Sequence, residues 1–227
     1  TNTDLGAQYI ESGSTTITLR HETNDLNLDA VTTAQTLNLV AGTDTIDASS
    51  MTAALTVKYA VSTDLNSSED TITAGTSLND VLELTYSGAA AALDGVTNFE
   101  TIKGGSDLAQ TITTVDGNVA STKSLTIDMT ANATTTATVD ISAETNGAIT
   151  ILGGASANTV TLSVSSMGDT FTGGAGTDGV TVAVAQLTSA DTLNGVSGTD
   201  TITFSDAGVV SDADFTNVTN FDSLTLA

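Results

Sequence analysis

The sequence predicts an all-β protein in which short strands stack as a parallel β-roll or β-solenoid, a series of coils around a narrow core. Apolar residues alternate with polar ones over short stretches, which is typical of strands. These stretches recur about every 11 residues, which leaves no room for crossover helices. The turns between them are rich in Gly, Asp and Asn, and the chain contains no Pro. A set of β-sandwich repeats is the alternative, because its strands have similar spacing.

The clearest strands lie in the second half of the chain. The apolar residues predicted to face the core there are Leu125/Ile127/Met129, Val139/Ile141, Ile149/Ile151, Val160/Leu162, Phe171, Val180/Val182, Leu193 and Ile202/Phe204. Two such strands make one coil of about 20 to 22 residues. Residues 87–93 contain a run of Ala that predicts a short helical turn, and residues 131–137 are expected to form a solvated strand or loop.

A longer repeat divides the chain. Residues 95–102, GVTNFETI, match residues 217–224, NVTNFDSL, and each copy follows an Asp-rich turn and an apolar strand. We therefore expect an N-terminal strand region continuing from a longer chain, a first repeat unit, Thr-rich connecting strands and a second repeat unit. Their predicted ranges are 1–36, 37–105, 106–152 and 153–227.

The composition limits the function. The 27 acids stand against only four Lys and Arg, giving a net charge of −23, which excludes a nucleic-acid binder held by phosphate contacts. No apolar run reaches the roughly 20 residues of a membrane-spanning helix, so we expect no membrane insertion. The chain has no Cys, so neither disulfides nor thiolate sites are available. An acid-rich protein of this kind can be stabilised by bound metal ions instead of disulfides.

One motif carries a specific chemical signal. Residues 173–181, GGAGTDGVT, match every position of the pattern Gly-Gly-x-Gly-x-Asp-x-apolar-x, which binds calcium in parallel β-helical proteins. Glycines permit positive-φ turns that point carbonyl groups inward, and the aspartate adds an anionic oxygen for a hard cation. Degenerate copies surround it in phase. The candidate calcium ligands of this unit are Asp169, Gly173, Gly174, Gly176, Asp178, Asp191, Gly195, Gly198 and Asp200.

The first unit carries a weaker version of the same signal. Asp44, Asp70 and Asp80 introduce strands but lack the double glycine, so they are candidate ligands with turn formation as the alternative role. Stacked coils place the carboxylates of successive turns close together, where they repel unless a cation neutralises them. We therefore expect Ca²⁺ as the cofactor, with its binding energy contributing to folding.

These motifs resemble those of RTX-type proteins. In that family a calcium ion lies between same-side turns, which implies the pairs Asp169 with Asp191 and Asp178 with Asp200 here. Several predicted strands begin with Asp-Thr-Ile or Asp-Thr-Leu, and others begin with a sequence such as Asn-Phe-Glu-Thr-Ile. These strand starts resemble the crystalline region of surface-layer proteins of Gram-negative bacteria. The resemblance implies an extracellular structural subunit, exported by type I secretion and assembled at the cell surface in a calcium-dependent way. Its expected partners are further copies of itself, in a lattice or filament, and cell-surface polysaccharide.

Two alternatives remain open. An RTX adhesin or spacer module of a large secreted protein can present a ladder of threonines to ice or a glycan, with Thr134, Thr136 and Thr138 as candidates. A calcium-binding β-helix module that acts on polysaccharide is the third functional hypothesis. We expect no enzyme and assign no catalytic residue, because the four basic residues are scattered and His21 is the single histidine.

Overall fold

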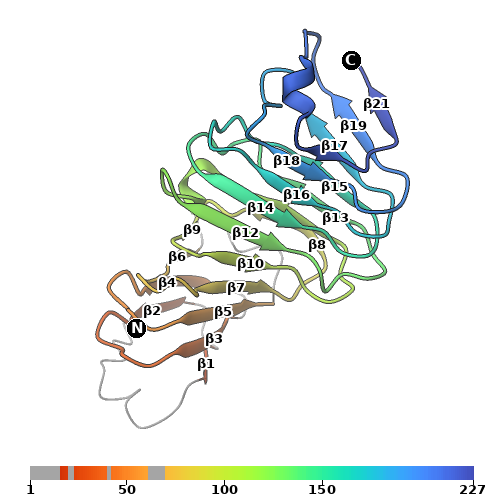
Figure 1. Cartoon of the computed structure of the whole chain (residues 1–227). Helices are drawn as coiled ribbons and strands as arrows, with labels where there is room; N and C mark the ends of the chain where they lie inside the picture. Colours follow the sequence, from red (N-terminus) through yellow and green to blue (C-terminus); the bar gives the residue numbers. More distant parts are fainter. Residues whose placement is uncertain (1–15, 20–22, 40–41, 61–69) are drawn as a thin grey trace.

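The computed structural model describes residues 16–19, 23–39, 42–60 and 70–227, with the backbone alone for residues 88–92. All strands of this part of the chain pair in parallel with strands of neighbouring coils (Figure 1). The chain is therefore a parallel β-solenoid, and the all-β solenoid predicted from the sequence is confirmed. A sandwich of antiparallel repeats is excluded for these residues, because each strand pairs with one about a coil away in the sequence.

Three sheets form the walls of the solenoid. Sheet A contains β1 (Thr16–Thr18), β3 (Gln35–Leu39), β5 (Leu55–Tyr59), β7 (Val81–Leu84), β10 (Thr101–Lys103), β12 (Ser124–Asp128), β14 (Ala148–Leu152), β16 (Thr170–Thr172), β18 (Thr192–Asn194) and β20 (Val218–Thr219). Sheet B contains β2 (Thr23–Asn27), β4 (Thr43–Asp47), β6 (Thr71–Thr73) and β9 (Val96–Thr97). Sheet C contains β8 (Gly88–Ala92), β11 (Gln110–Thr113), β13 (Ala137–Asp140), β15 (Asn158–Thr161), β17 (Gly179–Val182), β19 (Thr201–Phe204) and β21 (Ser223–Thr225). Two short 3-10 helices complete the described elements: η1 (Asp116–Asn118) and η2 (Asp212–Phe215).

Sheet A runs the whole described length, whereas sheet C replaces sheet B partway along it. The coil between β7 and β10 contains both β8, which begins sheet C, and β9, which ends sheet B. The helical turn predicted over residues 87–93 is wrong, because this segment is the strand β8. Its pairing with β11 satisfies the backbone through contacts between coils, and this outweighs the high helix propensity of Ala, because so short a run does not sustain a helix by itself.

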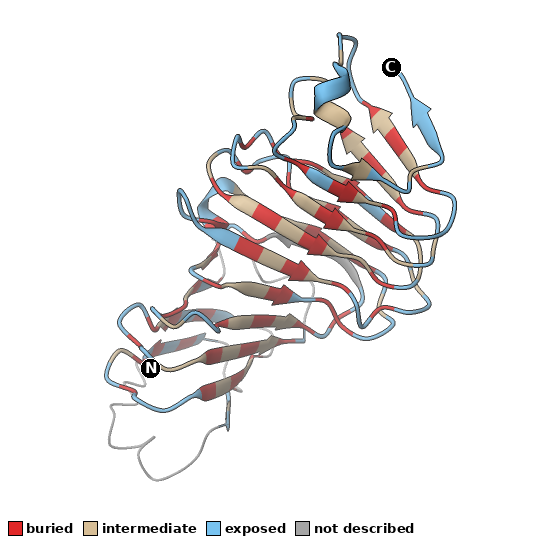
Figure 2. Cartoon of the chain, in the orientation of Figure 1, coloured by how far each residue is buried: buried red, intermediate tan, exposed pale blue. Residues whose placement is uncertain are grey.

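The core is a stack of aliphatic side chains in register. Along sheet A the central inward positions are Ile17, Leu37, Val57, Leu82, Ile102, Ile127, Ile151, Phe171, Leu193 and Val218. Every apolar residue predicted to face the core of the second half is buried. Figure 2 shows the resulting alternation of buried and more exposed residues along the strands. Parallel stacking thus repeats one period-two pattern from coil to coil.

The repeated segments at 95–102 and 217–224 adopt the same local turn. Asn98 and Asn220 occupy equivalent places and both have positive φ, 63° and 56°, a conformation that Asn tolerates well. The first copy leads from sheet B to sheet A, whereas the second leads from sheet A to sheet C. The repeat therefore specifies a strand, a turn and a strand, but not the sheet that receives them. Sheet A is continuous across the repeats, and the four-part division of the sequence stays a prediction.

Candidate metal centre

In-register stacking lines up three carboxylates at the start of the strands of sheet C, of which Asp178 and Asp200 are buried and Asp222 is exposed. We call this row the C column; its acidic members are Asp178, Asp200 and Asp222. Asp178 Oδ1 accepts hydrogen bonds from the backbone N–H and the side-chain amide of Asn158, both at 2.8 Å, and Oδ2 accepts from Gly174 N–H at 2.9 Å. Asp200 Oδ1 accepts from Asp178 N–H at 2.8 Å, and Asp222 Oδ2 accepts from Asp200 N–H at 2.8 Å. Each carboxylate therefore fastens its own coil to the preceding one.

A second pair lies at the start of sheet A strands. Asp169 Oδ1 accepts from Ile149 N–H at 3.0 Å, and its Oδ2 accepts from the Ser163 hydroxyl at 2.6 Å. Asp191 Oδ1 accepts from Asp169 N–H at 2.7 Å, while Oδ2 accepts from Thr188 N–H at 2.8 Å. The two predicted pairs, Asp169 with Asp191 and Asp178 with Asp200, are thus neighbours on successive coils. What joins them is a bond from backbone N–H to carboxylate.

The aspartates of the first unit are bonded in the same manner. Asp70 Oδ1 accepts from Asp44 N–H at 2.7 Å, and Asp70 Oδ2 accepts from the Tyr59 hydroxyl at 2.7 Å. Asp80 Oδ1 accepts from Leu55 N–H at 2.7 Å. All the aspartates predicted as ligands, in both units, are buried. These bonds give them a structural role that needs no metal, and calcium ligation by them stays a prediction.

The glycines of the motif serve close packing between coils. A Cβ at Gly174 would collide with the carbonyl oxygen of Gly154 on the preceding coil, and one at Gly173 would collide with the Asp178 carboxylate. Gly173, Gly174, Gly176 and Gly195 lack the positive φ expected from the sequence; among the predicted glycines only Gly198 has one, at 137°. The glycines are required because a side chain would hold neighbouring backbones apart.

Asp200 is the position of the C column that best fits a cation. Its side chain is buried and its Oδ2 has no hydrogen-bond partner. A Cβ at Gly195 would collide with both the Asn220 carbonyl oxygen and Asp200 Oδ2, so two acceptor oxygens approach one spot that only glycine leaves open. Carboxylate and carbonyl oxygens are the ligands that calcium prefers. Within the described residues no three acidic or histidine side chains gather around one point, so carbonyl oxygens and water would have to complete the coordination.

Burial also perturbs the acidity of three carboxyls. Burial raises the pKa of Asp200 above its usual value, and the charges of Asp178 and Asp222 raise it further. Burial likewise raises the pKa of Asp80 and of Asp169, against opposing hydrogen bonds from backbone amides. Each group therefore binds its proton more tightly in the folded chain than in the unfolded one.

Mild acid is accordingly expected to stabilise the calcium-free protein. Because these three pKa values exceed the unfolded value of about 3.9, stability falls as pH rises through the folded pKa values and is recovered below them. Thermal melts in chelator should show a melting temperature that falls as the pH is raised from about 4, the unfolded pKa of an aspartate. Asp200→Asn should reduce this slope, because it removes one of the titrating groups. A melting temperature that increases with pH over this range would contradict the assignment.

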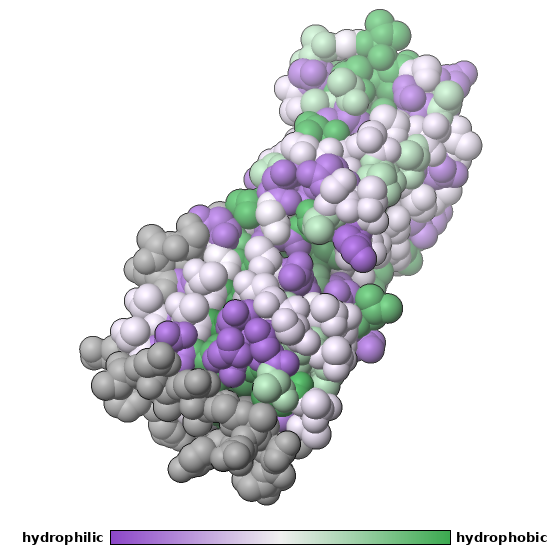
Figure 3. All heavy atoms as spheres, turned by 90° about the vertical axis from the view of Figure 1, so that its left-hand side faces the viewer, coloured by the Kyte–Doolittle hydropathy of each residue, from purple (hydrophilic) through white to green (hydrophobic). Residues whose placement is uncertain are grey.

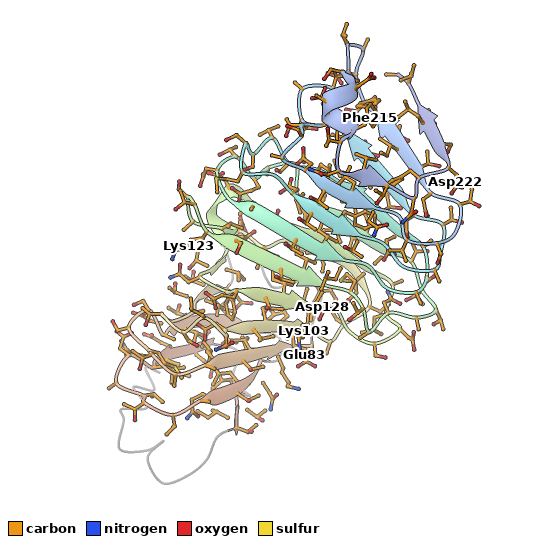
Figure 4. All side chains as sticks on the ribbon, in the orientation of Figure 1. Glu83, Lys103, Lys123, Asp128, Phe215 and Asp222 are labelled. Carbon is orange, nitrogen blue, oxygen red and sulfur yellow. The ribbon has the colours of Figure 1, made fainter. Side chains whose placement is uncertain are left out.

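Two of the basic side chains lie beside acidic ones on the outer face of sheet A. Lys58 and Glu83 form an ion pair at 3.0 Å, and Lys103 stacks in register between Glu83 and Asp128. Figure 4 shows Glu83, Lys103 and Asp128 on neighbouring strands of this sheet. His21 and Arg20, one of the four basic residues, lie outside the described residues. The expectation of no enzymatic activity stays a prediction.

Together the stacked coils and their buried carboxylates define a parallel β-solenoid repeat protein. No protein-family model, curated protein or solved structure matches the chain. Among the described residues, no helix is both long enough and apolar enough to span a membrane. The fold class therefore rests on the observed strand pairing, and the function has to be argued from the surfaces of this molecule.

Proposed function

We propose that this chain is an extracellular structural protein, a calcium-stabilised solenoid that associates with further copies of itself in a surface layer or filament on bacterial cells. The observation that carries the proposal is the apolar surface of the last described coil, residues 209–226. There β20 and β21 are the edge strands of sheets A and C. A hollow of about 250 Å³ at this end is lined by apolar residues that include Phe215, Val218 and Phe221.

This end has the features of an association surface. Edge strands present backbone N–H and C=O groups that can pair with another chain. Leu224 is 48% exposed, Leu226 70% and Val209 92%, although most other large apolar residues of the described chain are buried. Figure 3 shows apolar atoms gathered at this end of the molecule. A second copy that covers this surface removes apolar area from water and supplies backbone partners.

Calcium is linked to association through the C column. Asp222, the last carboxylate of the column, lies on the same final coil as β20 and β21 (Figure 4). A cation bound at Asp200 Oδ2 would offset the repulsion among three stacked carboxylates and fix this coil against its neighbour. An ordered final coil is what a second copy needs to dock on. The RTX resemblance of residues 173–181 supports the same reading.

The test is electron microscopy of calcium-free protein before and after calcium is added, with magnesium as the control. The wild-type chain should form ordered sheets or filaments with calcium only. Leu224→Lys should prevent assembly by placing a charge on the exposed end. Val164→Lys, at a residue of matched exposure (52%) on a turn of the solenoid wall, should assemble normally. Folded particles of wild-type protein that stay dispersed in calcium would overturn the proposal.

One surface favours the alternative of an adhesin. The predicted ladder of Thr134, Thr136 and Thr138 is not formed, because residues 132–136 are not a strand and Thr134 bonds to Asp107. The outer face of sheet C instead carries two in-register rows of small side chains, nine of twelve being threonines. They are Thr111, Thr138, Thr159, Gly179, Thr201 and Ser223 in one row, and Thr113, Asp140, Thr161, Thr181, Thr203 and Thr225 in the other.

This threonine array is regular and almost uncharged. Its hydroxyls repeat at about 4.8 Å between strands and about 6.7 Å along them, and Asp140 is its single charged member. Such a face suits an uncharged, hydrogen-bonding lattice such as ice. Inhibition of ice recrystallisation that is lost with Thr161→Lys, but kept with Thr150→Lys on sheet A, would favour the adhesin. No inhibition by the wild-type chain would remove ice from consideration as the ligand.

A further inference from the structure

Three unsatisfied buried oxygens lie on two neighbouring turns outside the acidic columns. Within the described residues, five buried side-chain polar atoms lack a hydrogen-bond partner. Three of them, Thr114 Oγ1, Glu144 Oε2 and Asn146 Oδ1, belong to two neighbouring turns. Because buried polar atoms are nearly always paired, three unpaired oxygens on neighbouring turns indicate that these turns have a bound partner such as an ion or water.

The two turns, residues 114–122 and 140–147, are stacked on each other. Thr114 N–H donates to the Asp140 carbonyl oxygen at 2.9 Å, and Thr122 N–H donates to the Asn146 carbonyl oxygen at 3.2 Å. A further bond joins them, from Thr145 N–H to Asp116 Oδ1 at 2.9 Å. The three unpaired oxygens are therefore held by neighbouring, mutually bonded segments. We call this place the stacked-turn site.

Glu144 is the centre of the stacked-turn site. Its side chain is 0% exposed, and Oε1 alone accepts from the N–H groups of Thr145, Asn146 and Gly147, at 3.0, 2.8 and 2.7 Å. Oε2 receives no bond, and no ion pair involves Glu144 within the described chain. A buried carboxylate with one bare oxygen and no cationic partner is costly. Asp116, an exposed residue of the other turn, adds a second carboxylate through its bond to Thr145.

We propose that the stacked-turn site binds a calcium ion through Glu144 Oε2, Asn146 Oδ1 and Thr114 Oγ1, with water completing the coordination. All three atoms are oxygens, and the set combines a carboxylate, an amide and a hydroxyl, which suits a hard cation. The site contains no glycine of the repeated motif and no aspartate of the columns. It is therefore independent of the proposed function and of calcium at Asp200. Its role is to fasten two successive coils on the wall that lacks a sheet in this half of the solenoid.

Equilibrium dialysis of the full chain against labelled calcium tests the site. Glu144→Gln keeps the acceptor for the three N–H groups but removes the charge, so this variant should bind one ion fewer per chain than the wild type. Asp140→Asn, which removes the same charge from the same coil, should bind the full number. Asp200→Asn reports separately on the C column. Equal calcium binding by the wild type and Glu144→Gln would overturn the proposal and would show that ordered water fills the site.

A second variant tests the same site in case Glu144→Gln does not fold. Thr114→Val replaces an unpaired buried hydroxyl by a methyl of similar size. In chelator its melting temperature should match or exceed that of the wild type, because no bond is lost. In calcium its affinity at this site should fall by roughly tenfold or more, because a ligand has been removed. Unchanged calcium affinity with Thr114→Val would contradict the assignment of this ligand, and unchanged stoichiometry in both variants would refute the site.

Discussion

Asp178→Ala is expected to cost about 3 kcal/mol or more of unfolding free energy. The Asp178 side chain is buried and accepts three hydrogen bonds, from the backbone N–H and side-chain amide of Asn158 and from Gly174 N–H. Alanine leaves the backbone N–H groups of Asn158 and Gly174 without an acceptor, and each such loss costs about 1–3 kcal/mol. The Asn158 side-chain amide keeps the carbonyl oxygens of Gly154 and Ser156 as acceptors. Urea unfolding in chelator, followed by circular dichroism, measures this loss free of any effect of bound metal.

Two further variants separate the structural role from a metal role. Asp178→Asn keeps one acceptor oxygen, so it should lose less stability than Asp178→Ala in chelator. Asp25→Ala, at an exposed position of sheet B, should change the unfolding free energy by less than about 0.5 kcal/mol. If Asp178→Ala were as stable as the wild type in chelator and weaker only in calcium, the aspartate would act through metal rather than through the backbone.

Gly174→Ala is the second change with a large expected effect. The added Cβ would collide with the backbone carbonyl of Gly154 on the preceding coil, so the two coils have to move apart. In a close-packed stack such overpacking costs about 1–3 kcal/mol, and more where backbone blocks relaxation, so we expect a loss of about 3 kcal/mol. Because the register of the C column depends on this spacing, calcium affinity should fall as well.

Gly179→Ala is the matched control within the same nonapeptide. A Cβ at Gly179 meets nothing within 4 Å, and its φ lies outside the left-handed region. Alanine there should be neutral or should stabilise the strand β17 by up to about 1 kcal/mol, since glycine loses more conformational freedom on folding. Equal effects of the two substitutions on chemical unfolding would show that close approach between coils is not why Gly174 is glycine.

Part of the candidate site was visible in the sequence. The spacing of 22 residues that pairs Asp178 with Asp200 also separates Asp200 from Asp222, so the sequence contains a signal for Asp222, although no glycine motif precedes it. Glu144 had none, because it stands between Ala143 and Thr145 without any repeat around it. Its burial results from the way one coil stacks on the next, and a single-sequence pattern does not contain that information.

The sequence by itself determined the strands of the second half, their inward side chains and the coil length, because alternation and turn chemistry are local properties repeated many times. Only the tertiary structure decided which sheet each strand joins, as the two copies of the 95–102 segment show. It also assigned the motif glycines to close packing and gave the buried aspartates backbone donors from neighbouring coils. Both results depend on contacts between residues about 20 positions apart, whose partners are fixed by the register of stacked coils rather than by the residues around each position.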